Sequence, residues 1–174
     1  CTIANNIGAY KYEKFIGGPQ WTIDGLECYD GSASITNSII WNNNLGLSIA
    51  APDINDINDV NDVVVVVTYS DIQMFDSNGV INPGAVWDGE GNINEDPLFA
   101  DPDIWVPDYH LKSIAGRWDP QDPMNQQGWV FDNVHSPCID GGDPSSAYLL
   151  EPAPNGSRIN MGAYGNTRQA SKSP

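Results

Sequence analysis

The chain has few basic side chains. Seven lysine and arginine residues stand against 23 aspartate and glutamate residues, which gives a formal net charge of −16 over 174 residues. A surface with this excess repels a phosphate backbone and anionic lipid headgroups alike. Nucleic acid and membrane surfaces are therefore poor partners, whereas divalent cations, cationic surfaces and a simply solvated acidic exterior all suit the charge.

Long apolar runs are also missing. No stretch approaches the roughly 20 apolar residues that cross a bilayer, and no basic segment followed by an apolar one opens the chain. We therefore expect no membrane insertion and a single domain. Because Cys1 opens inside a repeated phrase, we expect the chain to be a piece of a longer translation product whose secretion signal lies upstream.

Cysteine is scarce. Cys1, Cys28 and Cys138 lack the spacing of metal ligands, and their odd number leaves at least one thiol unpaired within the chain. Cys28 and Cys138 could form a bridge, or they could be buried free thiols at inward solenoid positions. An exposed Cys1 could pair with a neighbouring molecule.

One short phrase occurs twice. Cys1-Thr-Ile-Ala-Asn-Asn6 and Ser38-Ile-Ile-Trp-Asn-Asn43 share a β-prone start and a closing pair of asparagines, at an offset of 37 residues. Repetition at such a period indicates stacked coils, in which each strand lies above its predecessor. The apolar residues then fill a narrow column, and the turn asparagines stack into ladders of hydrogen bonds. The sequence therefore predicts an all-β fold, a parallel β-solenoid.

The first 73 residues contain the clearest strands. Gly and Asp-Gly turns separate β-prone stretches at 21–24, 25–29 and 34–41, which together suit one coil of a solenoid. A continuous β-branched run at 63–67 is typical of a strand buried on both faces. We predict solenoid coils over residues 1–73, with loop insertions at about 7–20 and 50–62.

The second half is rich in proline and glycine, which excludes long helices there. Short strands are expected at 92–94, 108–112, 128–131 and 158–161. An irregular segment of this kind can cover the exposed strand edges of a solenoid. Residues 74–174 are therefore predicted to form the last turn and a C-terminal cap.

Five phrases of the chain, in order, resemble the C-terminal end of large bacterial right-handed parallel β-helix proteins, the pectate-lyase-like secreted and surface proteins abundant in planctomycetes. They are Thr68–Gln73, Gly91–Phe99, Asp108–Leu111, Ser136–Pro144 and Arg158–Gly165. The resemblance implies a right-handed β-helix of a few turns and an extracellular or cell-surface location. Members of that family are mostly of unassigned activity, although the same superfold carries polysaccharide lyases and hydrolases.

An acidic repeat is the candidate metal site. Asp53, Asp56, Asp59 and Asp62 alternate with asparagines and concentrate the hard oxygen ligands that calcium prefers. The segment lacks the glycine and terminal glutamate of an EF-hand loop. Calcium is therefore the candidate cofactor, and a solvated loop held extended by its like charges is the alternative.

No catalytic residue is assigned. A lyase needs a base beside a metal-neutralised carboxylate, for which Lys11, Lys14, Lys112, Arg117 and Arg158 are available, but Arg158 suits a structural salt bridge or a clamp on carbonyl groups better. A glycosidase needs two facing carboxylates, whereas the aspartates of the cap occur largely in Asp-Pro settings that favour turns. His110 lies in an alternating strand pattern without a nucleophile nearby, which favours packing. An enzyme of this sequence would be a polysaccharide lyase or a glycoside hydrolase.

Aromatic residues of the cap could bind carbohydrate. The tryptophans of the strand phrases, Trp21 and Trp41, are expected to pack against the coils. Those of the cap region are less constrained and could form a stacking platform for sugars: Trp87, Trp105, Trp118 and Trp129.

Three functions therefore remain open. The favoured one is a non-enzymatic extracellular structural or interaction protein, a β-helical segment that self-associates end to end through its open β-helix ends, as a filament or surface layer, or that continues a longer β-helix. A carbohydrate-binding module and a polysaccharide lyase or hydrolase are the alternatives.

Overall fold

The computed structural model describes residues 1–4, 25–28, 32–43, 46–49, 64–75, 81–102, 107–119 and 128–174. These residues form short strands and no helix, so none of them belongs to a helix that could span a membrane. The strands are β1 (Thr2–Ala4), β2 (Gly25–Cys28), β3 (Ser32–Thr36), β4 (Ile39–Trp41), β5 (Gly46–Ile49), β6 (Val64–Thr68), β7 (Asp71–Ile72), β8 (Phe99–Asp101), β9 (Asp108–Leu111), β10 (Arg117–Trp118) and β11 (Trp129–Val130).

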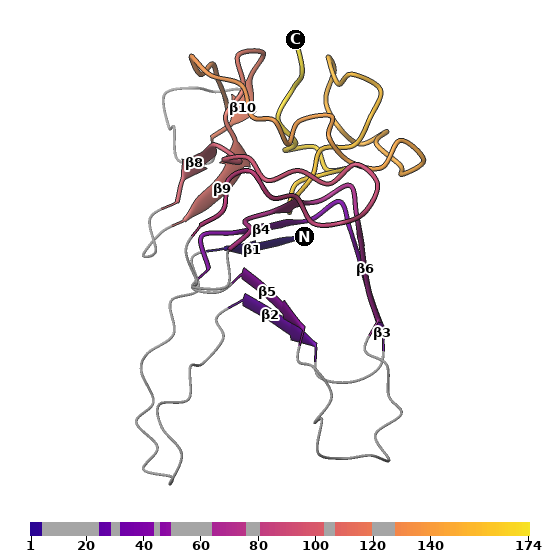
Figure 1. Cartoon of the computed structure of the whole chain (residues 1–174). Helices are drawn as coiled ribbons and strands as arrows, with labels where there is room; N and C mark the ends of the chain where they lie inside the picture. The colour runs from indigo at the N-terminus through magenta and orange to yellow at the C-terminus, as the bar shows by residue number, and fades with distance from the viewer. Residues whose placement is uncertain are drawn as a thin grey trace, which may run out of the picture.

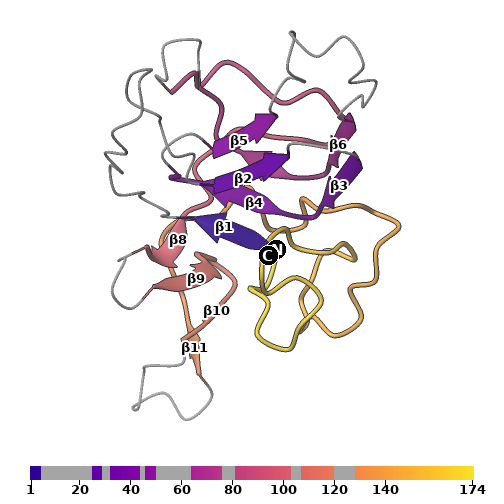
Figure 2. The same ribbon diagram turned by 90° about the horizontal axis from the view of Figure 1, so that it is seen from below.

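The first seven strands pair only in parallel. They form three sheets, β1–β4–β7, β2–β5 and β3–β6 (Figure 1). The successive strands β2, β3 and β4 thus lie beside β5, β6 and β7 in the same order, and Figure 2 shows the pairs β2–β5 and β3–β6 meeting at an angle. Thr2 pairs with Ile39, the offset of the repeated phrase, whereas Ile39 pairs with Asp71 at an offset of 32 residues.

The ladder through β4 and β7 continues by one further rung. Ile93 forms a parallel bridge with Asp71 and accepts a hydrogen bond from the Ile72 amide at 3.0 Å. Its own amide donates to the Ser70 carbonyl at 2.9 Å. Residues near Ile93 therefore cover the edge of β7, although they form no longer strand.

Two sharp corners lie at equivalent places, one between β3 and β4 and the other between β6 and β7. Asn37 and Tyr69 occupy these corners with φ values of 52° and 47°. Asparagine adopts the left-handed region with little strain, whereas a bulky tyrosine adopts it rarely. The backbone turns in the same way at both corners.

Hydroxyl groups stack from one corner to the other. Ser38 and Ser70 each donate to the carbonyl two residues earlier at 2.9 Å, and the Ser70 hydroxyl also accepts from the Ser38 amide at 3.2 Å. The Thr36 and Thr68 hydroxyls lie 3.0 Å apart. Serine and threonine therefore stack at these corners. The asparagine ladder that the sequence predicts involves Asn5 and Asn6, which lie outside the described residues.

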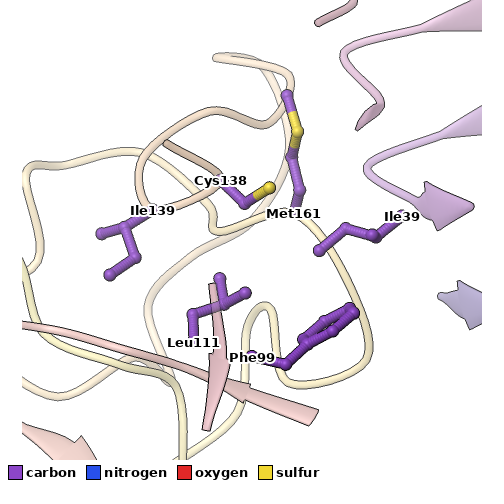
Figure 3. Packing of buried hydrophobic residues seen from close by; sticks show 6 residues of the cluster. All are labelled: Ile39, Phe99, Leu111, Cys138, Ile139 and Met161. Atoms are coloured by element: carbon purple, nitrogen blue, oxygen red, sulfur yellow. The ribbon is translucent and has the colours of Figure 1, made fainter. Parts of the chain in front are cut away.

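Strand β4 separates two apolar clusters. Ile39 and Ile40 are neighbours in sequence, both with 0% exposure, and they point into different clusters. Ile40 packs between the sheets with Ile35, Val67 and Ile72. Ile39 packs on the other face of its sheet (Figure 3), in a cluster whose further members are Phe99, Leu111, Cys138, Ile139 and Met161.

The residues after Ile93 pack beside the β1–β4–β7 sheet. Strands β8 and β9 form an antiparallel pair, as do β10 and β11. Residues 131–174, here called the C-terminal region, contain no strand and lie on the side of β1 and β4 that faces away from β2 and β5 (Figure 1). The Ile39 cluster therefore lies between the β1–β4–β7 sheet and the residues that pack beside it.

Several local expectations require correction. The stretch 34–41 is two strands, because the chain turns at Asn37, and residues 92–94 form an isolated bridge at Ile93 and no strand. Val66 in β6 is 52% exposed, so this strand is not buried on both faces as its β-branched run predicted. Residues 158–161 form no strand, because the Asn160 amide donates to the Glu151 carboxylate at 2.9 Å instead of to another strand. Cys138 is a free buried thiol, so the alternative of a bridge to Cys28 is wrong. The loop insertions predicted at 7–20 and 50–62 lie outside the described residues.

Of the two structural roles predicted for Arg158, a salt bridge and a carbonyl clamp, the structure shows the clamp. Its guanidinium donates to the carbonyls of Gly142 and Gly141, the latter at 3.0 Å, and lies 5.6 Å from the centre of the Tyr69 ring. The clamp thereby joins the C-terminal region to the corner between β6 and β7.

Candidate functional site

The structure places the predicted site residues in different surroundings. The calcium candidates Asp53, Asp56, Asp59 and Asp62 lie outside the described residues, as does Trp105. Within the described part of the chain, no three His, Cys, Asp or Glu side chains gather closely enough to hold a metal ion. Trp87 packs against the Ile40 cluster, whereas Trp118 and Trp129 come together.

Trp118 and Trp129 are opposite residues of the β10–β11 pair. Their ring centroids lie 5.6 Å apart with an angle of 79° between the planes, the edge-to-face arrangement that aromatic pairs prefer. Gly128 precedes Trp129 with φ 66°, and a Cβ atom on it would lie 2.6 Å from the Trp118 ring. Glycine is therefore required for the hairpin to bring the two indoles together.

Phe131 extends this aromatic pair, although the sequence did not single it out. It is 74% exposed, and a Cβ atom on Gly116 would lie 3.6 Å from the Trp129 ring and 3.8 Å from the Phe131 ring. Residues two apart along a strand share a face, so the Trp-Val-Phe alternation was the signal that could have found it. We call Trp118, Trp129 and Phe131 the aromatic hairpin.

A cation lies against one ring of the aromatic hairpin. The Lys172 ammonium is 4.0 Å from the centre of the Trp129 ring, within the range of a cation–π interaction. The Lys172 carbonyl also accepts from the Ser113 hydroxyl at 2.5 Å, and its amide donates to the Gly116 carbonyl at 2.9 Å. The hairpin is thereby held to the end of the C-terminal region.

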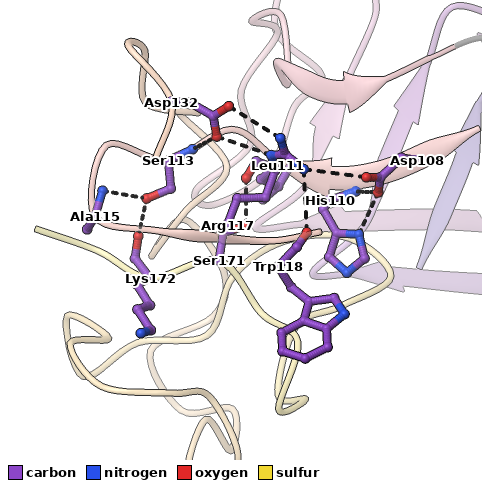
Figure 4. Close-up of polar contacts among 10 residues, drawn as sticks. All are labelled: Asp108, His110, Leu111, Ser113, Ala115, Arg117, Trp118, Asp132, Ser171 and Lys172. Atoms are coloured by element: carbon purple, nitrogen blue, oxygen red, sulfur yellow. Dashed lines mark hydrogen bonds and ion pairs between the residues drawn. The ribbon is translucent and has the colours of Figure 1, made fainter. Parts of the chain in front are cut away.

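Arg117 forms buried ion pairs that hold the aromatic hairpin in place (Figure 4). Its guanidinium lies 3.2 Å from an Asp132 carboxylate oxygen and 3.5 Å from one of Asp108. Asp132 also accepts from the Ser113 amide at 2.9 Å. Because Arg117 and both carboxylates are largely buried, their bonds fix β9, β10 and the residues after β11 relative to one another.

Asp108 and His110 form a second buried pair beside Arg117. The two side chains lie 2.5 Å apart, from Nδ1 to Oδ1, and the His110 ring stacks on Tyr164 at 3.6 Å. Burial alone would raise the pKa of Asp108, but the hydrogen bonds from His110 and the charge of Arg117 outweigh burial and lower it. His110 is 2% exposed, and its Nε2 has no hydrogen-bond partner among the described residues.

Two surface pockets flank β8. One of about 150 Å³ is lined by Ala100, Asp101, Asp108, Arg117 and Asp119. The other, of about 230 Å³, is lined by Trp41, Asn42, Asp96, Leu98, Phe99, Pro102 and Lys112. Asp96 accepts a hydrogen bond from the Leu98 amide at 2.9 Å, the turn chemistry expected of an Asp-Pro setting.

The chain is similar to one known family over part of its length. A family model described as disaggregatase related matches residues 77–142, less than half of the chain. No curated protein and no solved structure matches the chain. The matched residues contain both antiparallel strand pairs, and with them the whole aromatic hairpin and the residues that brace it. The match to this family model does not support the resemblance to pectate-lyase-like proteins.

Proposed function

We propose that the chain is a segment of a non-enzymatic, extracellular structural or interaction protein, a right-handed parallel β-helix whose open end accepts a further coil. One observation carries the proposal. Among the described residues, β1, β2 and β3 each pair along one edge only, with β4, β5 and β6. Their other edges present backbone N–H and C=O groups that another strand can bind.

The opposite end of the stack is covered over β7 and at the corner before it, whereas β5 and β6, like β2 and β3, each pair along one edge only among the described residues. The Tyr69 amide, just beyond β6, donates to the Glu90 carbonyl at 2.8 Å, and Ile93 covers the edge of β7. Strand addition is therefore least hindered at the end formed by β1, β2 and β3, where either a preceding coil of the same polypeptide or a second copy of the chain would bind. A second copy bound at this end forms a closed dimer more readily than a filament.

Self-association tests this proposal. Sedimentation velocity between about 1 and 100 µM should show a sedimentation coefficient that increases with concentration. Placing lysine in β1 with Ala4→Lys should abolish the increase, because a lysine on an edge strand opposes further pairing. Ala147→Lys makes the same change of charge at an exposed residue of the C-terminal region and should leave association intact. A monomer at every concentration contradicts the proposal.

Carbohydrate binding by the aromatic hairpin is the second candidate function. It is supported by the 74% exposure of Phe131 beside Trp129, on a hairpin that buried ion pairs make rigid. Rigid aromatic side chains bind a ligand with little loss of conformational entropy. The hairpin also lies within the residues that match the disaggregatase-related model, whose description names an activity that takes aggregates apart. A surface that binds the polymer of an aggregate would suit such an activity.

Truncating the hairpin tests the second function. We expect Phe131→Ala to weaken binding to glycans found on an array at least tenfold, a loss of about 1.4 kcal/mol, when affinity is measured by titration calorimetry. Leu149→Ala is the matched control, because Leu149 is an apolar residue of the C-terminal region with 84% exposure. Equal affinity of the two variants, or a wild-type chain that binds no glycan, contradicts this function.

A further inference from the structure

A carboxyl group lies buried on the face of the β1–β4–β7 sheet that packs against the C-terminal region. Asp71 occupies the rung between Ile39 and Ile93, and its exposure is 0%. A carboxylate at such a position loses its hydration, so either it finds strong donors or it takes up a proton.

The partners of Asp71 come from two later segments. The Cys138 Sγ lies 3.1 Å from Oδ2 as a thiol donor, and the Glu95 amide donates to Oδ1 at 3.2 Å. Cys138 is also fully buried, and its carbonyl accepts from the Met161 amide at 2.9 Å. The contact between Asp71 and Cys138 therefore joins β7 directly to the interior of the C-terminal region.

The ionisable groups that face Asp71 do not compensate its charge. They are the Cys138 thiol, Glu95 and Asp96, all of them acids. Burial raises the pKa of Asp71 from 3.8 to about 7; the hydrogen bonds from Cys138 and the Glu95 amide oppose this rise, and the charges of Glu95 and Asp96 add to it. Burial and the Asp71 charge raise the pKa of Cys138 well above its ordinary value, so the thiol keeps its proton.

We propose that Asp71 and Cys138 form a proton-operated latch between β7 and the C-terminal region, closed when Asp71 carries a proton and loosened when it ionises. In the protonated state the buried pair is neutral, and Oδ1 still accepts from the Glu95 amide. In the ionised state a carboxylate without a cation is held away from water, and separating the two segments lets water reach it.

The direction of the pH dependence follows from the two states of the carboxyl group. Its pKa is about 7 in the closed form and near the ordinary 3.8 in the open form, so the closed form binds the proton more tightly. The opening equilibrium is lowest below about pH 4, increases about tenfold per pH unit up to about pH 7, and is constant above it. The full change is about three orders of magnitude.

Amide hydrogen exchange from pH 4 to pH 9, corrected for the intrinsic pH dependence, measures this opening. The Gly162 amide, which donates to the Asn37 carbonyl at 2.9 Å, and the Asp143 amide, which donates to the Asn37 side chain at 2.6 Å, both report contact between the C-terminal region and the coils. Their protection should fall between pH 4 and pH 7 in the wild type. It should be high and constant in Asp71→Asn, which keeps the shape of the side chain but cannot ionise.

Controls separate a latch from a general effect of acid. Asp88→Asn removes an exposed carboxylate and should keep the wild-type profile. The Gln73 amide, which donates to the Ile40 carbonyl inside the coils at 3.0 Å, should show no such loss of protection. A Gln73 profile that follows that of Gly162 shows global unfolding and overturns the latch, as does an unchanged profile in Asp71→Asn.

Direct titration of Asp71 keeps the proposal testable if Asp71→Asn does not fold. The ¹³C chemical shift of the Asp71 carboxyl carbon should titrate near neutral pH in the wild type. In Cys138→Ala the midpoint should move to higher pH, because the ionised carboxylate loses a donor. An ordinary midpoint near pH 4 in the wild type, or an unmoved midpoint in Cys138→Ala, contradicts the latch.

Discussion

Shortening Ile39 to alanine should lower the free energy of unfolding by about 3 kcal/mol, within the range measured for buried aliphatic truncations. Ile39 has 0% exposure and lies between β4 and the C-terminal region, in the cluster that contains Phe99, Leu111 and Met161. Both walls of this cluster are anchored by backbone hydrogen bonds, such as that from the Met161 amide to the Cys138 carbonyl. The surrounding backbone therefore cannot move in to fill the cavity. The loss of stability includes both the burial of the removed atoms and the contacts that the cavity lining no longer makes.

Urea denaturation followed by circular dichroism measures this loss. Val66→Ala is the matched control, because Val66 lies in a parallel strand of the same stack but is 52% exposed. We expect the control to lose less than about 1 kcal/mol, since an exposed side chain leaves no cavity. Equal losses for the two variants would show that the C-terminal region does not pack on Ile39.

Replacing Asn37 by alanine should also cost about 3 kcal/mol, for two separate reasons. The residue has φ 52°, a conformation that costs an alanine about 1 kcal/mol. Its side chain accepts from the Asp143 amide at 2.6 Å and donates to the Ser146 hydroxyl at 2.9 Å. Each of these hydrogen bonds contributes about 1 kcal/mol when its partner is left unpaired by the substitution.

Asn37→Gly separates the two contributions. Glycine adopts the left-handed conformation without strain but removes both side-chain hydrogen bonds, so we expect a loss of about 2 kcal/mol. Thermal unfolding of the wild type and the two variants under identical conditions makes the comparison. A glycine variant as unstable as the alanine variant would show that the conformation of Asn37 contributes nothing measurable.

The strands of the first half could be predicted because their signal is local. The repeated phrase has an offset of 37 residues, which is the register between Thr2 and Ile39. Strand β6 likewise coincides with a β-prone run, whereas the single run at 34–41 contains both β3 and β4 with a corner between them that was not predicted. The exposure of Val66 could not be predicted in the same way, because a continuous apolar run does not show which of its residues faces another sheet.

The candidate site could be predicted only in part. Trp118 and Trp129 were chosen from their place in the cap, and their pairing could not be predicted because it depends on the register of β10 against β11. Phe131 was missed because the alternation Trp-Val-Phe shows that Trp129 and Phe131 share a face but not whether that face is exposed. The partner of Asp71 could not be predicted, because Cys138 lies 67 residues further along a proline-rich segment without periodicity. For the same reason, a disulfide and a thiol–carboxylate contact were equally compatible with Cys138.

The two corners also have a consequence for how such a chain can vary in length. Asn37 and Tyr69 turn the backbone alike, and Ser38 and Ser70 make the same bond to the carbonyl two residues earlier. Each corner therefore provides the hydrogen-bonding groups on which the next corner stacks, whatever the sequence of the loop between them. A gene that duplicated the segment between them would add a coil whose ends already fit, while the packing around Ile39 stayed the same. Growth or shortening by whole units is thus the evolutionary change that this architecture tolerates best.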